Sequence, residues 1–239
     1  MQRLLITRPL KQAERMQRLA DTHEVLTWIA PVMTTVMMPV FELVDFDHYD
    51  AFITTSMSGI DCLVEMTVRR DIPLFCAGFM SAEVAREYGF RIVHCAETPG
   101  AAGIVNYLKM FAFDRVAYFH GATIKMDIAA KCSDFMIVDS FCVYKTVPVV
   151  QWADETIALF HKNEIQAITF YSEKSALITL DLLRAHSVLS FTPSIVALCL
   201  SPAIADIISK HLWKNVYIAS TSSELIAILK DKQSVKGCT

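Results

Sequence analysis

The fold is decided by two stretches of sequence, Asp50–Ser56 (DAFITTS) and Gln166–Ser172 (QAITFYS). Each stretch is mostly apolar, as expected of a buried strand, and ends in a serine that opens a helical pattern. The two serines lie 172 − 56 = 116 residues apart. A second pair, Cys76–Ala82 (CAGFMSA) and Cys199–Ala205 (CLSPAIA), follows in the same order at an offset of 205 − 82 = 123. Two similar offsets indicate two lobes built on one plan.

Short β-prone runs alternate with helical patterns along nearly the whole chain, which is typical of parallel sheets covered by helices on both faces. The predicted strands lie near Arg3–Thr7, Glu24–Trp28, Ala51–Thr55, Leu74–Ala77, Arg91–His94, Arg115–Phe119, Met136–Tyr144, Ala167–Phe170, Ile195–Leu200 and Asn215–Ile218. Helices are predicted between them, among others at Ser81–Tyr88 and Lys125–Lys131. The predicted fold class is therefore α/β, with two flavodoxin-like, doubly wound parallel-sheet lobes.

The composition argues against two classes of partner. Apolar residues make up 54% of the 239 residues, and the formal net charge is −3, so nothing favours nucleic acid. The densest apolar runs, Val25–Phe41 and Ser187–Ile208, are interrupted by prolines and polar residues, so we expect no membrane partner. A small polyanion can still be bound by a few local arginines and lysines.

The cysteines, histidines and glycines give no sign of metal or nucleotide chemistry. Seven cysteines contain no CxxC pair, which indicates core residues in a reducing compartment; we expect a cytoplasmic protein without a signal peptide. The seven histidines lack metal-ligand spacing, and His120, at a predicted strand end, is given a structural role. GxGxxG and GxxxxGK[ST] are absent. The sequence predicts no metal and no cofactor.

In doubly wound sheets, ligands bind outside the carboxyl ends of the strands. Here those ends hold Thr55-Ser56, Gly78 to Ser81, Ser172 and Ser201-Pro202. If the strand ends of the two lobes faced each other, they would form a cleft. The sequence therefore predicts a ligand site among these small polar residues.

An ordered series of short motifs resembles the uroporphyrinogen-III synthase family. It consists of Leu5–Pro9 (LITRP), the two strand-then-serine segments, Ala77-Gly78 with Ser81-Ala82, Glu87–Phe90 (EYGF) and Val143–Val147 (VYKTV). No motif is specific by itself, but the series runs from about residue 3 to residue 230. The resemblance implies a cofactor-free lyase that dehydrates and cyclises hydroxymethylbilane, with inversion of its last pyrrole ring, to uroporphyrinogen III.

The resemblance also implies the domain layout. Residues 1–35 and 150–239 would form one discontinuous lobe, and residues 36–149 would form an inserted second lobe. The lobes would be joined by a two-strand hinge, with linkers near Val36–Phe41 and Tyr144–Val149, both extended and proline-bearing. We expect a monomer.

Tyr144 is the candidate catalytic residue that the resemblance implies, as an acid that assists departure of the substrate's hydroxyl. A phenol is protonated at neutral pH and can donate a proton. The alternative is a linker tyrosine that only packs against the hinge. Gly78 is a candidate for close approach of backbone to substrate, and the alternative is a simple tight turn.

The candidate substrate-binding residues are those suited to a polycarboxylate. Helix N-termini and exposed backbone N–H groups favour carboxylates, which suits Ser56 (with Thr55 before it), Ser81 and Ser172. The alternative is that each serine only caps its helix. Three cations are candidates for neutralising carboxylates, or are simply solvated: Arg8, Lys125 and Lys174.

Four positions depart from the family's pattern. Met57 and Glu173 stand where a proline commonly follows the serine, and Ser201 and Ile204 replace a glycine and a threonine in the lobe that contains the C-terminal third. The departures leave open a non-catalytic tetrapyrrole-binding regulatory module on the same scaffold. A two-lobed binding protein for a sugar or amino acid is a third reading, although such proteins usually carry a secretory signal.

Overall fold

The computed structural model describes residues 3–39 and 44–234 and divides the chain into two compact units. Unit 1 comprises Met1–Thr34 and Val147–Thr239, and unit 2 comprises Thr35–Thr146. The domain boundaries predicted after residues 35 and 149 fall near these divisions and stay a prediction. The last two residues of the predicted first linker, Val40 and Phe41, lie outside the described residues, as does Cys238.

Unit 1 contains a five-stranded sheet in the order β11-β10-β9-β1-β2, with parallel neighbours throughout. The strands are β1 (Arg3–Ile6), β2 (Thr27–Ile29), β9 (Ile165–Phe170), β10 (Val196–Cys199) and β11 (Asn215–Ile218). Numbered within the unit, their order is 2-1-3-4-5, the flavodoxin-like arrangement. The direction of winding reverses between β1 and β9, which makes this pair the topological switch point of unit 1.

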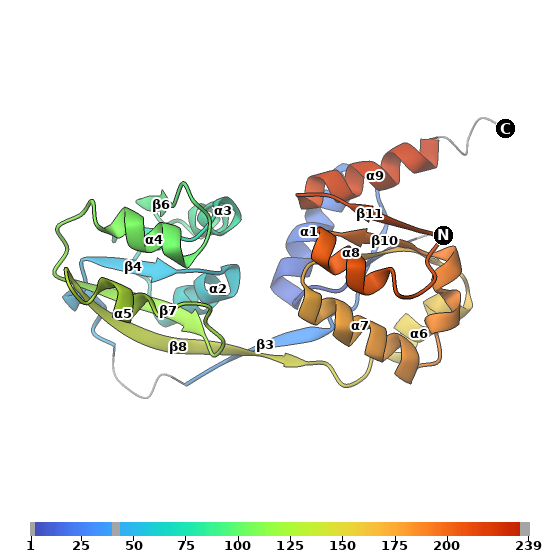
Figure 1. Cartoon of the computed structure of the whole chain (residues 1–239), viewed down its shortest axis with the longest axis horizontal. Coiled ribbons are helices and arrows are strands. Elements are labelled where there is room, and N and C mark those ends of the chain that lie inside the picture. Colours follow the sequence, from blue (N-terminus) through green and yellow to red (C-terminus); the bar gives the residue numbers. More distant parts are fainter. Residues whose placement is uncertain (1–2, 40–43, 235–239) are drawn as a thin grey trace. The chain divides into compact units, whose positions relative to one another are not determined.

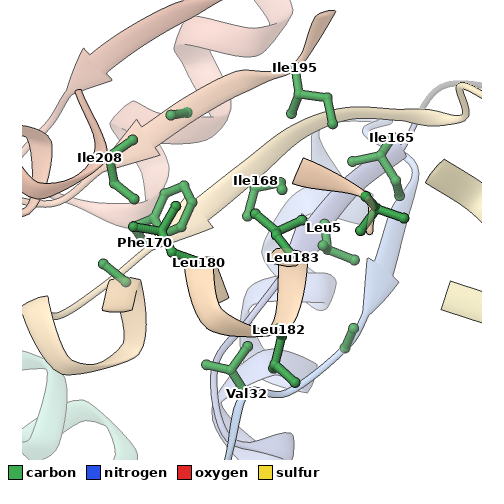
Figure 2. Packing of buried hydrophobic residues seen from close by; sticks show 14 of the residues in the cluster. Leu5, Val32, Ile165, Ile168, Phe170, Leu180, Leu182, Leu183, Ile195 and Ile208 are labelled. Carbon is green, nitrogen blue, oxygen red and sulfur yellow. The ribbon is translucent and has the colours of Figure 1, made fainter. Parts of the chain in front are cut away.

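Helices cover both faces of this sheet because neighbouring residues of each strand point to opposite sides (Figure 1). Leu4 and Ile6 pack under α1 (Leu10–Thr22) and α9 (Ser222–Ser234). Leu5 packs on the other side, under α6 (Asp154–His161), α7 (Glu173–Ala185) and α8 (Pro202–Ile208). Figure 2 shows this second core, in which Leu5, Ile168 and Phe170 meet Leu180, Leu183 and Ile208.

Unit 2 contains a six-stranded sheet in the order β3-β8-β7-β4-β5-β6. The strands are β3 (Met33–Met37), β4 (Ala51–Thr54), β5 (Leu74–Cys76), β6 (Val93–Cys95), β7 (Arg115–Gly121) and β8 (Ile137–Pro148). The five strands from β4 to β8 pair in parallel and, numbered among themselves, run 3-2-1-4-5, the other common doubly wound order. The switch point of unit 2 therefore lies between β4 and β7.

Both faces of the second sheet are also covered. Phe52 and Phe119 pack under α2 (Met57–Met66) and α3 (Phe79–Glu87), whereas Ile53 and Tyr118 pack under α4 (Ala101–Leu108) and α5 (Ile128–Cys132). Two short 3-10 helices, η1 (Phe46–His48) and η2 (Leu189–Ser194), complete the described elements. The predicted fold class, α/β with two doubly wound parallel-sheet lobes, is confirmed.

The internal repeat is visible in how the helices begin. Ser56 and Ser172 are the N-cap residues of α2 and α7, and each hydroxyl accepts a hydrogen bond from the backbone N–H three residues ahead. Gly78 and Ser201 are the N-cap residues of α3 and α8. The two sequence offsets thus correspond to matching helix starts in the two units.

Several predicted elements begin at other residues in the structure, and two of the shifts have a clear local cause. The helix predicted from Lys125 begins only at Ile128, because the Asp127 side chain caps α5 by accepting from the backbone N–H of Ala130. The strand predicted from Glu24 begins only at Thr27. Glu24 has a φ of 59° in the left-handed region, which ends α1 with a turn.

The predicted second linker is part of a long strand. β8 runs without interruption from Ile137 to Pro148, so the strand predicted at Met136–Tyr144 and the linker at Tyr144–Val149 form one element. β3 lies beside β8 in the sheet, and the backbone N–H of Met38 donates to the carbonyl of Val143 over 2.8 Å. The chain therefore passes between the units on two neighbouring strands, and a hinge there stays a prediction.

Candidate active site in unit 2 and a second polar cluster in unit 1

Ser56 connects the end of β4 to the side chain of Tyr144. Its hydroxyl accepts from the backbone N–H of Gly59 at 3.0 Å and lies 2.9 Å from the Tyr144 hydroxyl. Because β4 ends buried and α2 starts immediately afterwards, Ser56 is held in an extended conformation with its side chain fixed by the cap. The structure thus brings together two predicted site residues that are 88 positions apart.

Tyr144 reaches Ser56 because of an irregularity between β7 and β8. The register shifts between His120 and Gly121, so that Gly121 lies opposite Tyr144. A Cβ atom on Gly121 would stand 2.6 Å from Cζ of Tyr144 and 2.9 Å from its hydroxyl oxygen. The aromatic ring therefore rests on the bare backbone of Gly121, which a side chain at this position would prevent.

The environment of Tyr144 keeps its phenol protonated. Burial raises the pKa of Tyr144, while the hydrogen bond with Ser56 acts in the opposite direction. The side chain is nevertheless only half-buried, so that a ligand can reach it. The arrangement offers one directed O–H group at the switch point of unit 2, where doubly wound sheets bind ligands.

Thr55 is turned toward a different tyrosine. Its hydroxyl lies 3.2 Å from the hydroxyl of Tyr118, a buried residue of β7 whose ring centroid is 4.9 Å from that of His120. His120 Nδ1 lies 2.9 Å from the carbonyl oxygen of Gly121. Thr55 and His120 thus hold β4 and the end of β7 in place, beside the Ser56–Tyr144 pair.

The helix α3 begins with a glycine, Gly78, at its N-cap position, and Ser81 lies inside the helix. Gly78 is the N-cap residue, with a φ of −171° that any residue can adopt, and a Cβ atom there would have no neighbour within 4 Å. Ser81 is the third residue of α3 and is buried, so the interpretation of Ser81 as a cap was wrong. α3 consequently begins without a side-chain cap, and its first N–H groups are available to an anion.

The candidate lysines are exposed. Lys125 lies in the connection between β7 and α5, and Lys174 is the second residue of α7. Lys174 belongs to unit 1 and Lys125 to unit 2.

In unit 1, Ser172, Arg8 and Tyr171 gather at the switch point. Ser172 and Ser175 form a reciprocal capping box at the start of α7, with both backbone-to-hydroxyl distances at 3.1 Å. The guanidinium carbon of Arg8 lies 4.2 Å from the ring centroid of Tyr171, the residue just before Ser172.

The departures in unit 1 are structural. Ser201 caps α8, with its hydroxyl 3.4 Å from the backbone nitrogen of Ile204. Ile204 is buried in the core beneath α7 and α8 and therefore presents no group to a ligand.

Three residues beside the predicted site residues were not expected from the sequence: Gly121, Gly59 and Tyr171. Gly59 is needed because a Cβ atom would stand 2.2 Å from Thr54 Oγ1 and 3.3 Å from Ser56 Oγ, where the first turn of α2 crosses β4. For Gly121 a signal was available, since a glycine at the end of a β-prone run often marks a bulge or a close approach of backbone.

Neither metal nor membrane features were found within residues 3–39 and 44–234. That part of the chain holds no group of three or more His, Cys, Asp or Glu residues that could bind a metal ion. It also has no helix long and apolar enough to cross a membrane.

Fold and site together define a protein of two doubly wound α/β units whose small polar residues lie at strand ends. Its fold resembles that of a mutant uroporphyrinogen III synthase from Thermus thermophilus, with 16% sequence identity and a TM-score of 0.52 over 98% of this chain and 99% of the other. It also resembles that of uroporphyrinogen-III synthetase from Helicobacter pylori, with 15% identity and a TM-score of 0.59 over 98% of this chain and 100% of the other. No curated protein matches the sequence. The sequence pattern of the family described as uroporphyrinogen-III synthase HemD matches residues 14–225, and the chain belongs to this family. It is thus an enzyme of tetrapyrrole biosynthesis.

Proposed function

We propose that the protein is an active, cofactor-independent lyase that converts hydroxymethylbilane to uroporphyrinogen III. The observation that carries this proposal is the Tyr144 hydroxyl, directed by Ser56 at 2.9 Å and resting on Gly121 at the switch point of unit 2. Without an enzyme, the linear substrate closes to the isomer in which the last ring is not inverted. The protein's main task is therefore to hold a flexible chain in the geometry that favours inversion.

Tyr144 supplies the proton for the first step. The bond between the hydroxymethyl carbon and its oxygen breaks, the pyrrole nitrogen lone pair supplies the electrons, and the oxygen leaves as water with the Tyr144 proton. The last pyrrole ring attacks the resulting azafulvene through its already substituted α-carbon, which gives a spirocyclic intermediate. The older bond from that carbon to its methylene then breaks, and the methylene re-forms its bond at the ring's free α-carbon, which inverts the ring. The proton lost when the rings regain aromaticity balances the donated one. Burial, which raises the pKa of Tyr144, keeps the donor protonated at neutral pH.

The substrate's carboxylates meet backbone nitrogens at helix starts. The N-termini of α2, α3 and α7, which begin after Ser56, Gly78 and Ser172, each present N–H groups and the positive end of a helix dipole. Lys125 and Lys174 are exposed and neutralise carboxylates that extend into solvent.

The test of the function is the identity of the product. The purified protein is incubated with hydroxymethylbilane, and the products are oxidised and separated into type I and type III isomers. We expect type III to predominate. Type I alone, at the rate seen without protein, would contradict the proposal and favour a regulatory module that binds tetrapyrroles.

Tyr144→Phe is expected to lower kcat about 100-fold without abolishing type III formation, since general acid catalysis contributes about 10²- to 10⁴-fold. Tyr107→Phe is the matched control, because Tyr107 belongs to α4, which covers the other face of the sheet, and its hydroxyl lies 3.3 Å from His94 Nδ1 of β6. A Tyr144→Phe enzyme with unchanged kcat would leave Tyr144 as a packing residue only.

Gly78→Ala is expected to raise KM several-fold while changing the free energy of unfolding by less than about 1 kcal/mol. The added methyl group meets no protein atom within 4 Å, so that only a substrate lying against the backbone would feel it. Substrate kinetics and urea unfolding measure the two quantities. An unchanged KM would show that Gly78 serves only as the cap of α3.

Compartment and assembly are also part of the proposal. The six cysteines of the described chain are all free, which supports a reducing, cytoplasmic location. We propose a monomer, to be tested by light scattering.

A further inference from the structure

Within the described residues, Arg8 is a partly buried cation without a carboxylate partner. Its Nε and Nη2 atoms donate to one neutral acceptor, Gln12 Oε1, at 3.2 and 3.0 Å. No Asp or Glu in residues 3–39 and 44–234 forms an ion pair with it. Burial lowers the pKa of Arg8, Tyr171 acts in the opposite direction, and the like charge of Arg15 lowers the pKa further. A guanidinium in such surroundings is usually paired with an anionic group.

Tyr171 provides a second unsatisfied group next to Arg8. The Arg8 guanidinium lies over the Tyr171 ring. The Tyr171 hydroxyl oxygen is inaccessible to solvent and, within the described chain, has no hydrogen-bond partner of good geometry, although Arg8, Thr169 and Ser222 lie near enough to act on its pKa. A buried hydroxyl of this kind is costly unless something accepts its proton.

The position in the fold is that of a ligand site. Arg8 follows β1 and Tyr171 follows β9, the two strands between which the winding of unit 1 reverses. Thr7 Oγ1 donates to the Thr169 carbonyl at 2.6 Å, which fixes these two strand ends against each other. The first turn of α1, directly after Arg8, has neither a side-chain cap nor an acidic residue, so its dipole adds to the positive potential.

We propose that Arg8 and Tyr171 form a carboxylate-binding site outside the ends of β1 and β9 in unit 1. The inference deepens the proposed function, since the carboxylate would belong to the tetrapyrrole substrate. Arg8 would bind the carboxylate through its guanidinium edge, and the Tyr171 hydroxyl would donate to one carboxylate oxygen. Arg8 and Tyr171 bind a carboxylate and take no part in the proton donation proposed for Tyr144.

The test compares Arg8→Met, Arg8→Lys and Tyr171→Phe with wild type. Arg18→Met is the matched control, because Arg18 is an exposed arginine of α1. Two quantities are measured: KM for hydroxymethylbilane, and the dissociation constant of uroporphyrin I, a stable porphyrin polycarboxylate, from its fluorescence. Propionate is then added as a competitor of uroporphyrin I, to distinguish a site for any free carboxylate from one that requires the macrocycle.

Arg8→Met is expected to raise both constants about 10- to 100-fold with kcat nearly unchanged, as for loss of a charged hydrogen bond. Arg8→Lys should recover part of the loss, since it restores a point charge without the planar fork. Tyr171→Phe should raise both constants about 3- to 10-fold, and Arg18→Met should change neither. Competition by propionate in wild type but not in Arg8→Met indicates a general carboxylate site; no competition indicates one specific to the tetrapyrrole.

Unchanged constants in a folded Arg8→Met protein would overturn the inference. If Arg8→Met does not fold, as judged by circular dichroism, Tyr171→Phe decides by the same criterion. Binding of uroporphyrin I requires no turnover. A protein that forms only type I product but loses uroporphyrin affinity on Arg8→Met would therefore disprove the proposed function and leave this site standing.

Discussion

Replacing Gly121 with alanine is expected to lower kcat about 100-fold, as much as removal of the Tyr144 hydroxyl itself. The new Cβ atom would stand 2.6 Å from Cζ and 2.7 Å from Cε2 of Tyr144, far inside van der Waals contact. Gly121 is the last residue of β7 and its backbone is paired with β8, so the ring rather than the backbone will move. The Tyr144 hydroxyl then leaves its position 2.9 Å from Ser56. Steady-state kinetics with hydroxymethylbilane measure the loss.

A double-mutant cycle separates positioning from general damage. In the Tyr144→Phe background there is no hydroxyl to misplace, so Gly121→Ala should lower kcat by far less than in wild type. The overpacking itself is expected to destabilise unit 2 by about 1–3 kcal/mol in both backgrounds. Gly78→Ala, the same substitution at a position with no atom within 4 Å, serves as the control for stability alone. Equal losses of kcat in the two backgrounds would mean that Gly121 does not act through Tyr144.

The strand ends could be predicted from sequence because their signals are local. A buried β-prone run followed by serine predicts a strand and a capped helix, and both Ser56 and Ser172 are such caps. The same rule failed for Ser81, where the strand ends earlier and Gly78 takes the N-cap position. A serine at the third position of a helix can stand in the same kind of sequence as a serine at the N-cap position. Only the backbone conformation tells the two positions apart.

The contacts of the site depend on register, which the sequence does not display. Tyr144 was a candidate only through family resemblance, and its pairing with Ser56 requires the one-residue shift between β7 and β8 at Gly121. A shift of one residue turns every later side chain to the other face of the sheet. Tyr171 was overlooked for a different reason: it stands between the end of β9 at Phe170 and Ser172, and only the serine carries a helix-start signal.

Phe170→Ala is expected to destabilise unit 1 by about 3–5 kcal/mol, the usual effect of removing a buried phenylalanine. Phe170 is fully buried beside Leu180 and Ile208 in the core shown in Figure 2, and its ring centroid lies 5.6 Å from that of Trp213. Such a loss is a large part of the roughly 5–15 kcal/mol that stabilises a typical domain. The urea midpoint of unit 1 should fall by about 1–3 M, given the usual dependence on denaturant.

The tryptophans allow the two units to be followed separately. All three, Trp28, Trp152 and Trp213, belong to unit 1, whereas circular dichroism reports helices of both units. Phe170→Ala should therefore shift the fluorescence transition and only part of the circular dichroism change. Phe119→Ala, which removes an equally buried ring from unit 2, should do the reverse and leave the fluorescence midpoint in place.

The number of unfolding transitions tests the division into two domains. If both substitutions shift a single common transition, the two units unfold together, and the prediction of two independently stable domains is wrong. Separate transitions would mean that the Ser56–Tyr144 pair and the Arg8–Tyr171 pair rest on independently stable sheets, so that substitutions at one pair can be read without correction for the other.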